Sequence, residues 1–231
     1  FGYLHTMHRL GTVDVTSFAR GYSSDRGAGG LVLSPYASGQ ARQSDRDVVV
    51  QATVQRSTTR LSRISVGVQV HYSYEHYRDP DLVVGGGPLD DYFKDKALHV
   101  QSNVSLQPAE HLGLRFGGEI GYTSGHGNSL ARDVERNQAG LYLAAEHHCV
   151  WEASPVSEFI IAPGLRYDAG PGPMNALSPQ LSLTLAFRKF SSGVVQDMLP
   201  VLYATISRNY RVPTFNEMYF HGGGGIGNPS L

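Results

Sequence analysis

The feature that most constrains this chain is a regular alternation of apolar and polar residues. It is clearest at residues 64–75, where Ile64, Val66 and Val68 begin an apolar series interleaved with polar residues and glycine. A β-strand points successive side chains to opposite faces, so alternation separates the two kinds of residue in a strand but not in a helix. Similar runs occur at 46–56, 96–107, 111–122 and 156–168, around Leu141 and Leu181, and more weakly near 1–9, 12–18 and 199–210. No helical period is present, and the pattern predicts an all-β, antiparallel chain of about ten strands.

The connections between these predicted strands alternate between short and long. Consecutive antiparallel strands send every second connection to the same edge of a sheet, so all the long loops share one rim and all the short turns share the other. This arrangement is typical of outer-membrane β-barrels. The short connections lie near 9–11, 59–63, 108–111, 152–155 and 189–199, and the long ones at 20–45, 76–95, 123–136, 169–176 and 212–231.

Strand length and aromatic placement also indicate a membrane barrel. The clearest runs reach the roughly 9–11 residues that a tilted membrane-crossing strand needs, whereas strands of soluble proteins are usually about 5–6 residues long. The apolar face carries Tyr72, Tyr74, Tyr122 and Tyr167 toward the long-loop rim and Trp151, Phe159 and Phe187 toward the other, as two aromatic girdles would. We therefore predict an up-and-down transmembrane β-barrel, present here as an incomplete segment.

A soluble antiparallel sandwich or lipocalin-like barrel is the alternative, because its apolar face would show the same alternation turned inward. The opposite face is polar but poor in Lys and Glu, which favours a wet lumen over a solvated outer surface. The residues expected on this inner face are Gln51, Thr53, Gln69, His71, Gln101, Asn103, Arg115, Glu119, Arg166, Gln180 and Thr184.

Composition excludes several other classes. The formal net charge is −1 and the basic residues form no tail or stripe, so nucleic acid is not expected as a partner. The longest uncharged stretch, 169–187, holds three prolines and cannot be a spanning helix. The single cysteine, Cys149, cannot form an internal disulfide. No nucleophile-and-base motif occurs, so we expect neither an enzyme nor a cofactor.

One motif near the C-terminus resembles a known family. Residues 202–219 read LYATISRNYRVPTFNEMY, and GNPSL follows at 227–231. This is similar to the "LYASYSRGFRAPTFNELY" and "GNPNLKPE" motifs of TonB-dependent outer-membrane receptors, as is GLRYD at 164–168 followed by LSPQLSL at 177–183. We interpret the motif as a structural anchor at the barrel rim, in which Pro213 ends the strand ladder. Its residues are Arg208, Arg211, Pro213, Thr214, Phe215, Asn216, Glu217, Gly227, Asn228 and Pro229.

The resemblance implies a 22-stranded barrel in the outer membrane of a Gram-negative bacterium, with an N-terminal plug domain that carries the TonB box. It also implies import of a large, scarce nutrient such as an iron–siderophore, haem or cobalamin, driven through the TonB–ExbB–ExbD complex. Residues 1–231 are then expected to be one barrel segment. Its partners would be the remaining strands, the plug, and outer-membrane lipid or lipopolysaccharide. A passive porin-like channel or a structural component of an envelope complex is the alternative.

Ligand contacts are expected in the long loops, where aromatic and cationic side chains can grip a large chelate. The histidines supply no metal site, because those on one strand face lie too far apart and His147 and His148 point to opposite faces. The candidate ligand-contact residues are Tyr22, Arg26, Tyr36, Arg42, His76, Tyr77, Arg78, Tyr92, His126, Arg132, Arg136, Tyr219, Phe220 and His221.

Overall fold

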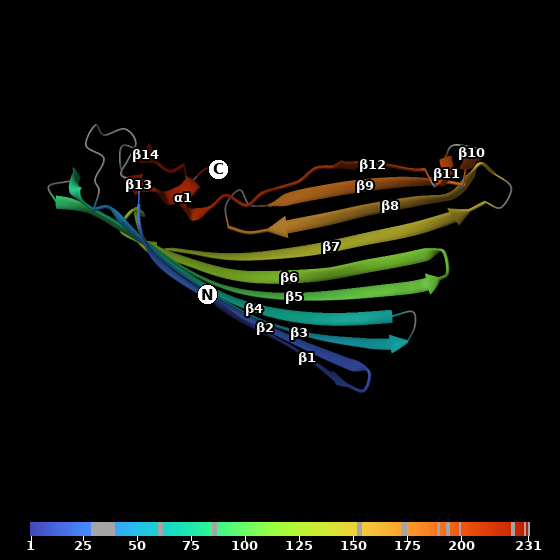
Figure 1. Cartoon of the computed structure of the whole chain (residues 1–231), viewed down its shortest axis with the longest axis horizontal. Coiled ribbons are helices and arrows are strands. Elements are labelled where there is room, and N and C mark those ends of the chain that lie inside the picture. Colours follow the sequence, from blue (N-terminus) through green and yellow to red (C-terminus); the bar gives the residue numbers. More distant parts are fainter. Residues whose placement is uncertain are drawn as a thin grey trace.

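A computed structural model describes residues 1–28, 40–59, 62–84, 87–151, 154–171, 175–188, 190–192, 195–198, 200–222, 225–228 and 230. Ten antiparallel strands form one sheet in the order β1-β2-β3-β4-β5-β6-β7-β8-β9-β12, and β1 and β12 are its two edges. The sheet is curved and unclosed (Figure 1). The strands are β1 (Gly2–Leu10), β2 (Val13–Gly27), β3 (Arg42–Thr59), β4 (Ser62–Val84), β5 (Gly87–Ala109), β6 (Leu112–Gly127), β7 (Val134–Val150), β8 (Val156–Ala169), β9 (Ala176–Phe187) and β12 (Val201–Ser207).

Three smaller elements lie outside the sheet. Strands β10 (Phe190–Ser192) and β11 (Val195–Met198) form a hairpin at the short-turn rim, between β9 and β12. Helix α1 (Phe215–Tyr219) and the pair β13 (His221–Gly222) and β14 (Gly225–Ile226) lie at the opposite, long-loop rim (Figure 1). The five-residue helix is too short to leave a helical period in the sequence, which predicted no helix.

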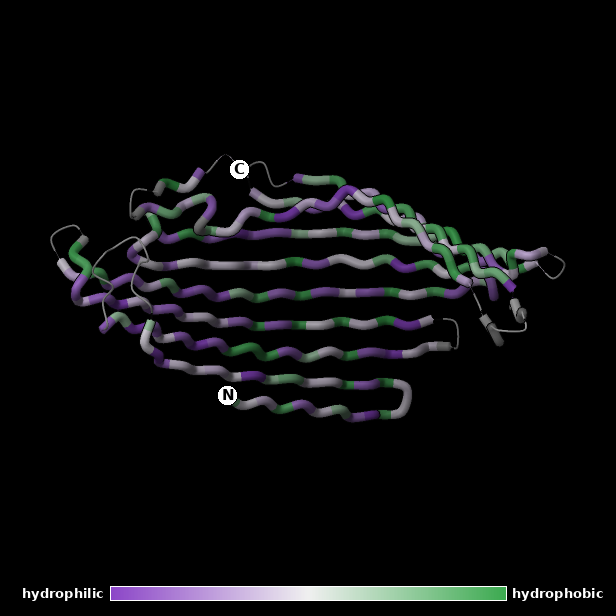
Figure 2. Tube along the Cα trace, turned by 45° about the horizontal axis from the view of Figure 1, so that its top comes forward, coloured by the Kyte–Doolittle hydropathy of each residue, from purple (hydrophilic) through white to green (hydrophobic). Residues whose placement is uncertain are grey.

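The strand register confirms the two predicted faces. Val50, Val70 and Leu98 are successive partners on neighbouring strands, and on the other face Thr53, Gly67, Gln101 and Glu119 follow one another in the same way. Hydrophobic and hydrophilic residues alternate along most strands (Figure 2). The apolar face is exposed: Val70 is 50% and Ile120 61% accessible. The fold is therefore an incomplete antiparallel β-barrel segment with an uncovered apolar outer face and a polar inner face.

The structure corrects the predicted loops at the long-loop rim. Residues 76–84 and 87–95, expected as loop, continue β4 and β5 as a protruding hairpin, and β2, β3 and β6 also run past their predicted ends. Above a membrane both faces of a strand are wet, so the residues there need not alternate. The sequence could therefore locate the membrane-crossing part of each strand but not its extension.

Candidate functional site: the polar inner wall and its rim

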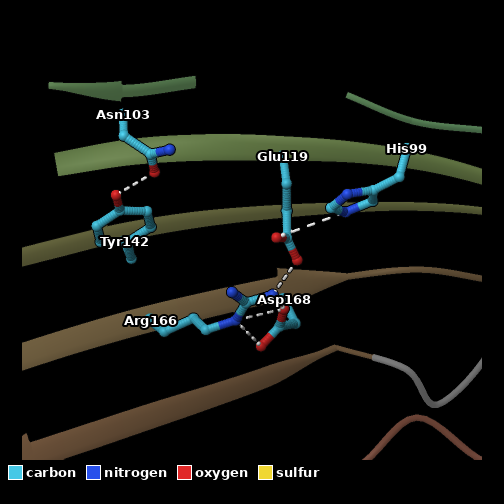
Figure 3. A network of polar contacts seen from close by, with 6 residues as sticks. All are labelled: His99, Asn103, Glu119, Tyr142, Arg166 and Asp168. Atoms are coloured by element: carbon cyan, nitrogen blue, oxygen red, sulfur yellow. Dashed lines mark hydrogen bonds and ion pairs between the residues drawn. The ribbon is translucent and has the colours of Figure 1, made fainter. Parts of the chain in front are cut away.

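The central inner face carries a network of charged side chains from three strands. Arg166 on β8 bonds Asp168 two residues away, with Nε at 2.9 Å from Oδ1, and also pairs with Glu119 on β6. Glu119 is in turn 3.5 Å from His99 Nε2 on β5. Figure 3 shows these groups converging on the Glu119 carboxylate. Arg166, Glu119 and His99 are partly exposed, so the network lines an open surface rather than filling a core.

Two glycines allow side chains from non-adjacent strands to meet on this wall. Arg166 and Glu119 lie on strands separated by β7, where Gly140 is the register partner of both Glu119 and Asp168. A Cβ added at Gly140 would lie 2.9 Å from Arg166 Nη2. In the same way the Tyr142 hydroxyl donates to Asn103 Oδ1 across Gly117, where a Cβ would lie 2.8 Å from the Tyr142 ring. Glycine at these positions therefore makes cross-strand bonding possible.

Closer to the long-loop rim, a second inner row alternates in charge across the strands. Asp47 accepts bonds from Arg20 at 2.6 Å and from His71 at 2.7 Å. His71 Nδ1 is also 4.0 Å from Asp95. These residues come from β2, β3, β4 and β5, so the row ties four strands together on the inner face.

At the rim itself, the predicted family motif folds into a compact segment that we call the rim clamp, residues 208–222 and 225–228. Its helix α1 begins with a capping box: Glu217 N donates to Thr214 Oγ1 (3.2 Å), and the Glu217 carboxylate accepts from Thr214 N (2.7 Å). Arg211 Nη1 also donates to this carboxylate, at 3.1 Å. Asn228 N donates to the Glu217 carbonyl at 2.8 Å, which brings the end of the motif back onto the helix.

The rim clamp is anchored on the inner side of β5, β6 and β7. Phe215 is 6% exposed and packs with Leu130 and Val134, with Phe93 at the edge of the cluster. Gly125 lies directly beneath, and a Cβ there would be 2.7 Å from the Phe215 ring. Arg136 Nη1 donates to the Pro213 carbonyl at 2.6 Å. These contacts join residues nearly eighty positions apart in sequence and fold α1 over the mouth of the lumen.

The contacts of the Glu217 carboxylate favour its charged form. Its hydrogen bonds with Arg211, followed by the bond from the Thr214 backbone, lower the pKa of Glu217 from 4.5 to about 2. The hydrogen bond with Glu217 in turn raises the pKa of Arg211. A charge pair between Arg211 and Glu217 and a helix cap from Thr214 therefore hold the rim clamp together.

The candidate ligand residues do not gather in one place. Tyr22, Arg26 and Tyr77 lie on the inner face of β2 and β4, and Arg26 pairs with Asp45 at 3.0 Å. The outward face of the strand extensions carries five others: Arg42, His76, Arg78, Tyr92 and His126. Arg132, Arg136, Tyr219, Phe220 and His221 belong to the rim clamp or contact it: Arg132 lies 5.4 Å from the Tyr219 ring. Tyr36 and Pro229 lie outside the described residues.

Two features of the inner wall and the rim clamp were not predicted from the sequence. Asp47, Asp95 and Asp168 are members of the inner rows, yet they are absent from the residues predicted for the inner face. Alternation along each strand from Gln51, Gln101 and Arg166 would have placed them on that face. The Thr214-x-x-Glu217 spacing is a capping box and would have predicted the start of α1.

The described residues contain no group of three or more His, Cys, Asp or Glu that could hold a metal ion. His76 instead bonds Asp90 at 2.6 Å, and His126 bonds Asp133 and the Tyr92 hydroxyl. Within the same part of the chain, no helix has the length and hydropathy needed to cross a membrane.

The chain matches a known family model over almost its whole length. The family model described as "TonB dependent receptor-like, beta-barrel" matches residues 3–231. No curated protein matches the chain. The match covers the N-terminal half as well as the motifs at 164–168, 177–183, 202–219 and 227–231 that carry the resemblance in the sequence.

Proposed function

The chain belongs to the TonB-dependent receptor β-barrel family, and from this premise we propose that it forms part of the wall of a transporter for a large, scarce nutrient. That family consists of outer-membrane receptors and transporters rather than enzymes. The cargo we propose is of the iron–siderophore, haem or cobalamin type, imported with energy transmitted by TonB–ExbB–ExbD to a plug domain outside this chain. The remaining barrel strands would pair with the free edges of β1 and β12.

The polar inner wall is the observation that supports transport best. Its charged groups are cross-linked by Arg166, Glu119 and His71 but remain partly exposed to the lumen. Such a surface is hydrated and can contact a polar plug or cargo, whereas the exposed apolar face can contact only lipid tails.

The mouth of this lumen is where we place the ligand contacts. Tyr22 and Tyr77 face inward near the long-loop rim, and the Tyr77 hydroxyl is buried without a hydrogen-bond partner among the described residues. Helix α1, which ends at Tyr219, and strand β13, which begins at His221, lie at the same rim (Figure 1). Tyr92 faces outward and would not contact cargo in the lumen.

Uptake of radiolabelled ferric siderophore, haem and cobalamin in a strain that lacks the receptor tests this proposal. The complete receptor should restore uptake of one of them only when tonB is intact. Tyr77→Ala should reduce ligand affinity, while the outward control Tyr92→Phe should leave it unchanged. Uptake that does not depend on tonB, together with stable single-channel conductance in planar bilayers, would instead indicate a passive porin-like channel. Mass spectrometry and metal analysis of co-purified material would identify the cargo.

A further inference from the structure

A cluster of cations on the outward face lies just beyond the aliphatic band. Arg46 on β3, Tyr74 on β4 and Lys94 on β5 are register partners on one row, and Lys96 lies one row closer to the band. Lys94 and Lys96 are two of only three lysines in the chain. We call Arg46, Lys94 and Lys96 the outer cation cluster.

These cations lack carboxylate partners. No salt bridge joins Arg46, Lys94 or Lys96 to any described residue. Three neighbouring outward acids pair with other residues: Asp25 with Arg42, Asp90 with His76 and Asp133 with His126. Glu135, on the row of Lys96 but two strands away, makes no ion pair with it. The three positive charges therefore remain available to an external anion.

Tyrosine rings contact two residues of the outer cation cluster, Arg46 and Lys94. Lys94 Nζ lies 5.7 Å from the Tyr74 ring centre and 5.3 Å from that of Tyr92, and Arg46 Cζ lies 6.0 Å from Tyr74 on its other side. Cation–π contacts at this distance orient a cation without neutralising its charge. With adjacent strands about 4.8 Å apart, Arg46 and Lys94 are anchored about 10 Å from each other.

An apolar groove begins beside the cluster, on the membrane side. It has a volume of ≈ 450 Å³, and its lining includes Leu98, Ile120, Tyr122 and Ala139. Leu98 follows Lys96 by two residues on β5, so the edge of the groove lies next to Lys96, and the groove extends from there across β6 and β7. Ala139 and Ala169 are register partners whose small side chains leave the groove open between larger neighbours.

We propose that the outer cation cluster and this groove bind one phosphorylated, acylated lipid of the outer leaflet, of the lipid A type. The cations would hold its phosphates and the groove one of its acyl chains. Phosphate favours Arg and Lys as partners, and removing the methylenes of an acyl chain from water is favourable. The orientation rests on the proposed function, in which the long-loop rim is extracellular.

The test uses the complete receptor, delipidated in detergent and titrated by native mass spectrometry with bisphosphorylated lipid A, its dephosphorylated form and inorganic phosphate. Wild type should bind lipid A at least about tenfold more tightly than the dephosphorylated lipid. The triple variant Arg46→Gln, Lys94→Gln, Lys96→Gln should lose that preference. Arg56→Gln, an outward cation near the short-turn rim, is the matched control and should keep it.

A second variant examines the groove separately. Ala139→Phe should weaken lipid A binding and leave the preference for phosphate intact. Equal lipid A affinity in the triple variant and wild type would overturn the proposal, and so would displacement of lipid A by inorganic phosphate at matched concentration. Because the triple variant should retain tonB-dependent uptake, failure of the lipid site is distinguishable from failure of the transport function.

Discussion

Glycines control how closely side chains approach one another on the inner face. Gly117 and Gly140 let residues two strands apart bond, and Gly125 provides the floor on which the Phe215 ring rests. In the sequence nothing distinguishes these positions from the glycines of other strands. Their roles follow only from the strand register, because each depends on a side chain that arrives from another strand.

Gly125→Ala should loosen the rim clamp. Its new methyl group would lie 2.7 Å from the Phe215 ring, so the ring must move out of its cluster with Leu130 and Val134. Overpacking of this kind costs about 1–3 kcal/mol. We expect faster trypsin cleavage after Arg208 and Arg211 in the complete receptor. Gly113→Ala is the matched control on the same strand, since its nearest contact would be 3.8 Å away; equal cleavage in the two variants would contradict the role of Gly125.

Acid should release the rim clamp through Glu217. Its pKa is depressed to about 2 in the folded chain, so its contribution is complete above the ordinary carboxyl range and is lost as the pH falls from about 4.5 toward 2. In a Cys149→Ser background, a spin label on Asn209→Cys should stay immobile between pH 8 and 5 and become increasingly mobile as the pH falls from about 4.5 toward 2. Glu217→Gln should be mobile at pH 7 and independent of pH; an immobile label in that variant would show that the Arg211–Glu217 pair is dispensable.

Each strand of the sheet presents two environments, and this could be predicted from the sequence for the membrane-crossing part. Alternation in residues 64–75 predicted the faces of β4 correctly, because lipid and a wet lumen impose opposite requirements on adjacent positions. The extension of β4 and β5 beyond Glu75 and Asp95 could not be predicted, since water on both faces removes that requirement. The rim clamp is likewise invisible to local patterns, because its partners lie far away in sequence.

Adjacent positions on β4 provide the test of this two-sided strand. Val68 is on the outward face and Gln69 on the inner face, within the same membrane-crossing stretch. Val68→Arg should destabilise the barrel by about 2–4 kcal/mol, because a charge near the bilayer midplane is poorly solvated. Gln69→Arg should cost little. Heat-modifiability on gels after expression in the outer membrane measures both, and equal sensitivity of the two variants would contradict the assignment of faces.

At the scale of the whole molecule, the two rims should lie on opposite sides of the membrane. Ala131 is exposed at the long-loop rim, beside the rim clamp, and Glu110 is exposed in a turn at the other rim. In a Cys149→Ser background, we expect a membrane-impermeant maleimide to label Ala131→Cys in intact cells and Glu110→Cys only after the outer membrane is disrupted. Labelling of Glu110→Cys alone in intact cells would show that the orientation is the opposite one. The proposed lipid site would then not lie in the outer leaflet.

The long reach of the rim clamp has a consequence for how the wall is assembled. Every ladder of the main sheet joins strands that are neighbours in the chain, with only the β10–β11 hairpin intervening between β9 and β12, so the contact order of the sheet is low and pairing can spread strand by strand. The bond from Arg136 to Pro213 spans 77 residues, and β8, β9 and β12 lie between its two ends in the chain. We therefore expect the rim clamp to close after these strands have paired, so a protease-resistant clamp would report that this part of the barrel has finished folding.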